Sequence, residues 1–108
     1  MGNQNSKVSG NTEQLVQDII RNNPVVLFSK TNCPYCRDAK YLLKQQNIDF
    51  KSYDLNIRQD GKLIQDYLYT VTGIRTVPNI FINGINIGGC NNLITAHTNG
   101  KLKLLLEN

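Results

Sequence analysis

The stretch VVLFSKTNCPYC, residues 25–36, joins an unbroken apolar run to two cysteines that are separated by two residues. The run Val25–Phe28 is typical of a short strand that is buried on both faces. Pro34 suits the first turn of a helix, because a proline there gives up only an N–H that the helix does not use. The stretch therefore predicts a strand, a loop and a helix, with Cys33 at or just before the helix N-terminus.

The residues on either side of this stretch alternate between helical and strand patterns. The predicted elements are a helix from a cap at Asn11 or Thr12 to 22, the strand 25–28, a helix from 33 to 47, a strand over 50–55, a helix capped by Asp60 that ends at Gly73, a hairpin of strands 80–82 and 85–87 around Asn83-Gly84, and one or two helices over 91–108 with a break near 99–100. The first strand–helix–strand unit predicts a right-handed, parallel connection. An α/β fold with helices on both faces of a small mixed sheet accommodates this order.

Composition and charge narrow the class of protein. The 108 residues suffice for one domain, which we assign to 12–108, and the polar residues 1–11 are expected to form a flexible arm. The net charge of +4 is spread along a chain without Trp, so a nucleic-acid partner is not expected. No apolar run is long enough to span a membrane, and no secretory signal starts the chain. A monomeric, cytoplasmic protein is expected.

The cysteine pair carries the chemistry. Backbone N–H groups at a helix start, together with the helix dipole, favour a thiolate at Cys33, and Lys30 and Arg37 add positive charge nearby. A thiolate is the attacking species in thiol–disulfide exchange. Cys36 lies one turn further along, more buried and close enough to form a disulfide with Cys33. The pattern therefore predicts that Cys33 attacks and Cys36 resolves.

Two structural interpretations of the same cysteines are weaker. A zinc site would need two more ligands, and only Cys90 and His97 remain, with a spacing unlike that of a zinc finger, so no metal is expected. Two unrelated buried thiols would not explain Pro34 or the position directly after a buried strand. Cys90 is expected to be a small core residue rather than a third redox thiol.

The chain resembles the dithiol glutaredoxins of the thioredoxin superfamily. The resemblance rests on Val25–Lys44 with its CPYC motif, on Gln65–Gly73, on Arg75-Thr76-Val77-Pro78 with the hairpin that follows, and on Ile87-Gly88-Gly89-Cys90. It implies the thioredoxin fold, with a four-stranded mixed sheet flanked by helices on both faces. It also implies a cis peptide bond before Pro78, where the residues alone favour an ordinary trans proline.

The resemblance further implies glutathione as the reducing co-substrate. In the family, residues at the positions of Lys30, Gln65 and Arg75 hold the glycine carboxylate, Tyr35 flanks the active thiol, and the backbone of Val77 pairs with the glutathione cysteine. The implied glutathione-binding residues are Lys30, Tyr35, Gln65, Arg75, Thr76, Val77, Pro78, Gly89, Asn91 and Asn92.

One position departs from the family pattern. Relatives often carry an Asp where this chain has Asn92, and that Asp accepts a hydrogen bond from the γ-glutamyl ammonium group of glutathione. Asn92 can still accept, but without the charge, and the expected loss of affinity is about 1 kcal/mol. The backbone N–H of Asn91 remains available for the same end of glutathione.

The function implied is a glutathione-dependent thiol–disulfide oxidoreductase that reduces protein–glutathione mixed disulfides and protein disulfides. One alternative is a carrier or sensor of a glutathione-ligated [2Fe–2S] cluster, but relatives with a proline at the position of Pro34 usually lack the cluster. Another is a thioredoxin-like protein that does not use glutathione, which Arg75 and the double glycine disfavour.

The N-terminus holds a separate signal. Met1-Gly2-Asn3-Gln4-Asn5-Ser6 fits the N-myristoylation pattern, with Gly2 as the acceptor once Met1 is removed. A single acyl chain binds membranes weakly and reversibly. We therefore expect at most a partial peripheral association with membranes.

Overall fold

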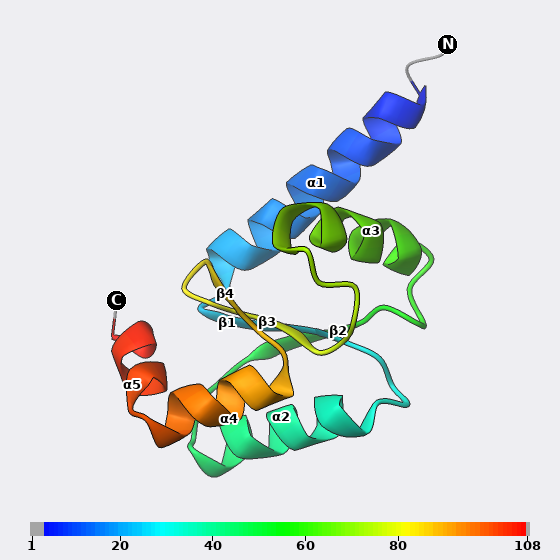
Figure 1. Cartoon of the computed structure of the whole chain (residues 1–108). Coiled ribbons are helices and arrows are strands. Elements are labelled where there is room, and N and C mark those ends of the chain that lie inside the picture. The colour runs from blue at the N-terminus through cyan, green and yellow to red at the C-terminus, as the bar shows by residue number, and fades with distance from the viewer. Residues whose placement is uncertain (1–3, 108) are drawn as a thin grey trace.

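The computed structural model describes residues 4–107 and contains one mixed sheet between two layers of helices (Figure 1). The strand order is β2 (Lys51–Asp54), β1 (Val25–Ser29), β3 (Asn79–Ile82), β4 (Ile85–Gly88). β1 is parallel to β2 and antiparallel to β3, and β3 is antiparallel to β4. The predicted four-stranded mixed sheet, with its parallel first unit and its antiparallel hairpin, is confirmed.

The helices divide between the two faces of the sheet. In Figure 1, α1 (Gln4–Asn22) and α3 (Gly61–Thr72) lie on one side, and α2 (Pro34–Gln45), α4 (Cys90–Thr98) and α5 (Lys101–Leu106) lie on the other. All five residues of β1 are buried, because alternate side chains of a strand enter opposite cores. Val26 and Phe28 pack with α1 and α3, whereas Val25 and Leu27 pack with α2, α4 and α5.

The register of the sheet brings three loops to one end of the molecule. Phe28, near the end of β1, pairs with Asn79 at the start of β3, and Ile80 pairs with Gly88 at the end of β4. The loop after β1, the loop before β3 and the turn after β4 therefore meet at the same edge of the sheet. These loops carry most of the residues singled out by the sequence.

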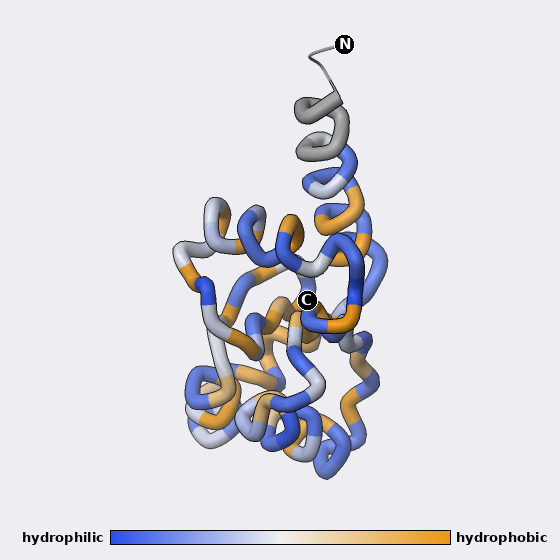
Figure 2. Tube along the Cα trace, turned by 90° about the vertical axis from the view of Figure 1, so that its right-hand side faces the viewer, coloured by the Kyte–Doolittle hydropathy of each residue, from blue (hydrophilic) through white to orange (hydrophobic). Residues whose placement is uncertain are grey.

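The first helix starts earlier than the predicted cap at Asn11 or Thr12. α1 begins at Gln4, and Thr12 is buried within it, so its side chain is not exposed at a helix start. In Figure 2, hydrophilic and hydrophobic residues alternate along the described part of α1, as expected for a helix with one packed face. Once a helix is nucleated, each added residue gains one hydrogen bond, and this gain allows the helix to include Gly10. Residues 4–11 of the predicted arm are thus helical.

Two further predictions concern the N-terminus and membranes. Gly2, the predicted acylation site, lies outside the described residues, and the acylation stays a prediction. Among the residues that the structure describes, no helix combines the length and the apolar character that crossing a bilayer requires.

The start of α3 differs from its prediction in one contact. Asp60 is the N-cap residue, but its side chain makes no capping hydrogen bond. Its carboxylate instead accepts hydrogen bonds from Nε and Nη2 of Arg58 at 2.7 and 3.0 Å, and the bond to Arg58 lowers the pKa of Asp60. A charge-assisted bidentate pair is stronger than a single bond to a backbone N–H, so the guanidinium takes the carboxylate. The helix ends at Gly73 in the left-handed conformation, as predicted.

Candidate active site

Cys33 is the N-cap residue of α2, where the loop after β1 becomes helical. Pro34 occupies the first turn, as predicted, and Cys33 has an extended backbone. The backbone N–H of Cys36 donates a hydrogen bond to Cys33 Sγ at 3.1 Å. Cys33 is partly exposed, so this sulfur is accessible from solvent. An N–H directed at a sulfur at a helix start stabilises negative charge on that sulfur, which is what a nucleophilic thiol requires.

Cys36 has the opposite environment. Its side chain is 1% exposed, and burial raises its pKa from 9.0 to about 12, with a further contribution from its hydrogen bond with Cys33. A backbone hydrogen bond at Lys30 and the charge of Lys40 act in the other direction but are smaller. Cys36 is therefore a protonated thiol at neutral pH. The two sulfurs lie one turn apart, and one is accessible while the other is buried.

The loop before β3 supplies the wall beside the thiol. The Cys33 thiol lies 3.6 Å from the backbone carbonyl oxygen of Val77, to which it donates. The peptide bond between Val77 and Pro78 is cis, as the resemblance implied and the residues alone did not. Pro78 is buried, whereas Thr76 before it is exposed. The structure thus brings Val77, from a distant part of the chain, into direct contact with Cys33.

Gln65, in the first half of α3, contacts Arg75, which lies in the loop that follows the helix. Gln65 Nε2 donates to the backbone carbonyl of Arg75 at 2.5 Å. The Arg75 guanidinium is exposed, with Nη1 3.2 Å from Asp66 Oδ1 and with Cζ 4.1 Å from the centre of the Tyr69 ring. Arg75 is therefore held on two sides before any ligand binds.

Two cations contact the carboxylate of Asp66 and lower its pKa. Lys62, one turn earlier in α3, lies 3.3 Å from the other carboxylate oxygen of Asp66. The hydrogen bond from Lys62, followed by that from Arg75, lowers the pKa of Asp66. Asp66 therefore stays ionised at neutral pH and pairs with both cations.

The turn after β4 contains the position that departs from the family pattern. Asn92 Oδ1 accepts a hydrogen bond from the backbone N–H of Gly89 at 3.1 Å, and so caps the start of α4. Gly88 has a φ of +101°, and a Cβ there would lie 2.6 Å from the same Oδ1. The Asn92 oxygen is thus already engaged with the backbone, although a carbonyl oxygen has a second lone pair for another donor. Gly89 in turn approaches the carbonyl of Pro78, which is 3.5 Å from where its Cβ would be.

The remaining predicted residues differ in exposure. Tyr35 is 62% exposed at the start of α2, Asn91 is exposed, and Lys30 is partly buried. Cys90 is 5% exposed and packs in the core with α2 and α4, and burial is the main cause that raises its pKa. The structure therefore makes Cys90 a poor candidate for a nucleophile.

Sequence reasoning missed Asp66 and Tyr69. Both follow Gln65 on α3, and their spacing of three residues places them on one helix face, which the sequence does show. Their contact with Arg75 depends on how the chain turns back after Gly73, and no local pattern reports that turn-back.

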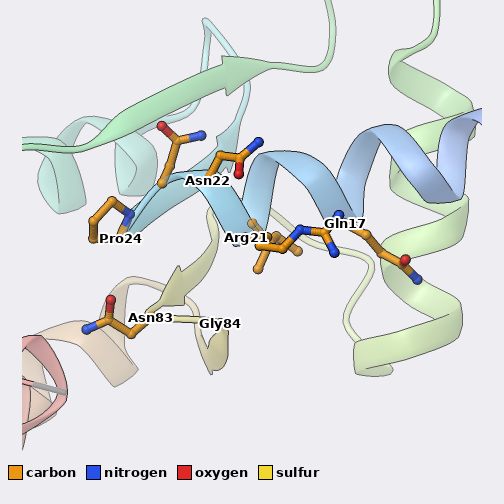
Figure 3. Close-up of a pocket in the computed structure, with 8 residues that line it drawn as sticks. Gln17, Arg21, Asn22, Pro24, Asn83 and Gly84 are labelled. Atoms are coloured by element: carbon orange, nitrogen blue, oxygen red, sulfur yellow. The ribbon is translucent and has the colours of Figure 1, made fainter.

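A pocket of 780 Å³ lies elsewhere and is not part of this site. Figure 3 shows it between the end of α1 and the β3–β4 turn, and Arg21, Pro24 and Asn83 are among the residues that line it.

Comparison with known proteins agrees with this arrangement. The family model described as Glutaredoxin matches residues 25–87. Glutaredoxin-1 of Rhizophagus irregularis is 45% identical over 91 residues, which cover 84% of this chain and 90% of that protein. Glutaredoxin-C2 of Arabidopsis thaliana is 47% identical over 93 residues, which cover 86% of this chain and 84% of that protein. The crystal structure of the buckwheat glutaredoxin–glutathione complex superimposes with a TM-score of 0.90 at 40% identity, covering 94% of this chain and 92% of that one. This chain belongs to the glutaredoxin family, whose members are glutathione-dependent thiol oxidoreductases.

Proposed function

We propose that this glutaredoxin reduces protein–glutathione mixed disulfides and protein disulfides, with Cys33 as the nucleophile and Cys36 as the resolving thiol. The observation that carries the proposal is the contrast between the two sulfurs. Cys33 Sγ is accessible and accepts the N–H of Cys36 at 3.1 Å, whereas Cys36 is buried with a pKa of about 12. The accessible sulfur can attack a substrate, and the buried one stays protonated until Cys33 is linked to another sulfur.

In the route that needs one thiol, the Cys33 thiolate attacks the glutathione sulfur of a mixed disulfide. The substrate S–S bond breaks, the protein thiolate leaves and takes up a proton, and Cys33 becomes disulfide-bonded to glutathione. The thiolate of a second glutathione then attacks the glutathione sulfur of this adduct. Oxidised glutathione leaves, and Cys33 returns to the thiolate.

In the route that needs two thiols, the Cys33 thiolate attacks one sulfur of a protein disulfide, whose S–S bond breaks. Cys33 forms a mixed disulfide with the substrate, and the other substrate sulfur leaves as a thiolate and takes up a proton from water. Cys36 Sγ then attacks Cys33 Sγ, and the bond between Cys33 and the substrate breaks. The substrate thiolate that leaves takes up the proton that Cys36 gives up, so that the substrate is released as a dithiol and Cys33 and Cys36 are disulfide-bonded. Two glutathione molecules supply the electrons that reduce this bond. The one-turn spacing of the two residues supports this step.

Glutathione is proposed to lie beside Cys33, along the loop that contains Val77. The buckwheat relative was crystallised with glutathione, and this chain has the same fold over nearly its whole length. The guanidinium of Arg75 suits the glycine carboxylate of glutathione, and the backbone of Val77 lies at the attacking sulfur. Holding the peptide in this way would direct its sulfur at Cys33, which is catalysis by positioning.

The proposal is tested by glutathione-dependent reduction of a glutathionylated peptide, coupled to glutathione reductase. Wild type, Cys36→Ser and Cys33→Ser are compared. We expect wild type and Cys36→Ser to turn over and Cys33→Ser to be inactive. Activity that survives in Cys33→Ser would refute the nucleophile assignment. A brown, inactive wild-type preparation that absorbs visible light would favour the cluster-binding alternative instead.

A further inference from the structure

The outer face of α2 carries a group of charges that take no direct part in the bond-making steps above, although Arg37 and Lys40 lie near the two thiols. Arg37, Lys40, Tyr41 and Lys44 follow a spacing of three and four residues, which places them on one face of the helix. With Asp38 they line a shallow hollow of 390 Å³. The opposite face of α2 is buried through Cys36, Ala39 and Leu43. We call the four residues Arg37, Lys40, Tyr41 and Lys44 the basic face of α2.

The positive charge of this face is only partly neutralised by the protein itself. Lys40 lies 3.7 Å from Asp54 on β2. Arg37 and Lys44 are exposed, and neither forms an ion pair within the part of the chain that the structure describes. Three cations and one carboxylate, that of Asp38, line the hollow, and among the described residues only Lys40 of these cations is paired with a further carboxylate, that of Asp54. A surface with this balance attracts negative charge.

An exposed aromatic ring lies among these charges. Tyr41 is 65% exposed on the same face. Its aromatic ring therefore lies in solvent and does not pack on the buried side of α2. Tyrosine and arginine are among the residues enriched where proteins bind other proteins, because each combines a large contact surface with polar groups. The composition of the face thus fits a polypeptide partner.

The face is connected rigidly to the reacting sulfur. Cys33 caps the helix that carries it, so Lys40 and Lys44 follow Cys33 by seven and eleven residues of one continuous element. At the helical rise these positions lie about 10 and 16 Å along the axis from Cys33. An extended peptide covers that distance with about three to five residues.

We propose that the basic face of α2 binds an acidic segment of the substrate protein, three to five residues from the cysteine that carries glutathione. This inference rests on the proposed function, because it assumes that Cys33 attacks such a substrate. The acidic side chains would pair with Arg37 and Lys44, and the peptide backbone would lie over Tyr41. Substrates would then be selected by charge at a distance from the reacting disulfide, and small disulfides would be unaffected.

The test compares three synthetic glutathionylated peptides of equal length. The first peptide has two acidic residues, one four positions before the cysteine and one four positions after it. The second peptide has lysines at those two positions. The third peptide has the two acidic residues directly beside the cysteine. The mixed disulfide of glutathione and mercaptoethanol serves as a small substrate. The enzymes are wild type, Lys44→Glu and, as a matched charge reversal, Arg21→Glu, which lies on α1 in the other helical layer.

We expect wild type to prefer the first peptide over the second by about fivefold in kcat/KM at low salt, with the preference shrinking at high salt. Lys44→Glu should abolish that preference, Arg21→Glu should retain it, and all three enzymes should reduce the small substrate equally. Equal rates of wild type with all peptides would overturn the proposal, as would an equal loss in Arg21→Glu, because the effect would then be one of net charge. Failure of every enzyme on the small substrate would instead refute the proposed function.

Discussion

Replacing Cys33 by serine leaves Cys36 as the remaining thiol of the pair, and we expect that thiol to resist alkylation. In the folded Cys33→Ser variant at pH 8, iodoacetamide should label Cys36 far more slowly than it labels Cys33 in the Cys36→Ser variant. The reason is that the reagent reacts with thiolates, and burial keeps Cys36 protonated. A serine hydroxyl at residue 33 can still accept a hydrogen bond from Cys36, and burial, the largest cause of the shift, is unchanged.

The structure sets the size of the effect. A pKa raised from 9.0 to about 12 lowers the thiolate fraction at pH 8, and a shift of that size corresponds to about a thousandfold. Cys36 is also only 1% exposed, so access to the reagent lowers the rate further. The folded protein should therefore react at Cys36 far more slowly than the same chain unfolded in guanidinium chloride, by up to about a thousandfold through the thiolate fraction.

The assay is timed labelling of the reduced protein, followed by mass spectrometry of its peptides. Mapping the peptides separates Cys36 from Cys90, which is also buried and also has a raised pKa. Unfolded Cys33→Ser is the control, because its Cys36 has an ordinary pKa. If folded Cys36 is labelled within tenfold of the unfolded rate, burial does not protect it, and the assignment of Cys36 as the resolving thiol loses its physical basis.

Three further outcomes are expected. Gly61→Ala should destabilise the fold by more than about 3 kcal/mol in urea unfolding, because the added Cβ would lie 1.7 Å from a backbone carbonyl oxygen. The control Gly10→Ala should be neutral or stabilising, because no atom lies within 4 Å of the added Cβ. Equal effects of the two substitutions would contradict the close packing at Gly61. Tyr69→Ala should raise the KM for glutathione about two- to fivefold with kcat unchanged, since its ring lies against Arg75, and Tyr69→Phe should retain the wild-type KM; a loss in both would point to the hydroxyl instead. Finally, the unfolded chain ionises Cys36 from pH 9.0 while the folded chain does so only at about 12. The free energy of unfolding of the reduced protein therefore keeps the full contribution of Cys36 below pH 9.0 and falls by up to about 1.4 kcal/mol per pH unit between pH 9.0 and about 12. Cys36→Ser should lose less over this range. Equal pH dependence of the free energy of unfolding in the two proteins would argue against the shift in the pKa of Cys36.

Local signals were sufficient for most of the elements. The apolar run of β1 and the proline at the first turn of α2 act within a few residues, and both were read correctly. The Asn83-Gly84 pair has positive φ at both residues and joins β3 to β4 as predicted. The order of elements, the mixed sheet and the position of the cysteine pair could therefore be predicted from the residues.

The resemblance to glutaredoxins added what local chemistry did not carry. The cis bond before Pro78 and the approach of Val77 to Cys33 followed from matching motifs rather than from the composition of the loop. The residues themselves favoured a trans proline, since that is the commoner state.

Contacts between distant segments were decided only in the folded chain. Asp66 and Tyr69 of α3 hold Arg75, which lies in the loop beyond the end of that helix. Propensities and periodicities report interactions over three or four residues, whereas these contacts depend on how whole elements pack.

The same reason separates the two active-site sulfurs. The CxxC spacing placed Cys33 at a helix start and Cys36 one turn away, and it predicted their order of action. The pKa of about 12 for Cys36 follows from its burial, and that burial exists only once α2 is packed onto the sheet. Spacing along the chain thus determined which atoms could react, and desolvation in the tertiary structure decided which of them stays protonated.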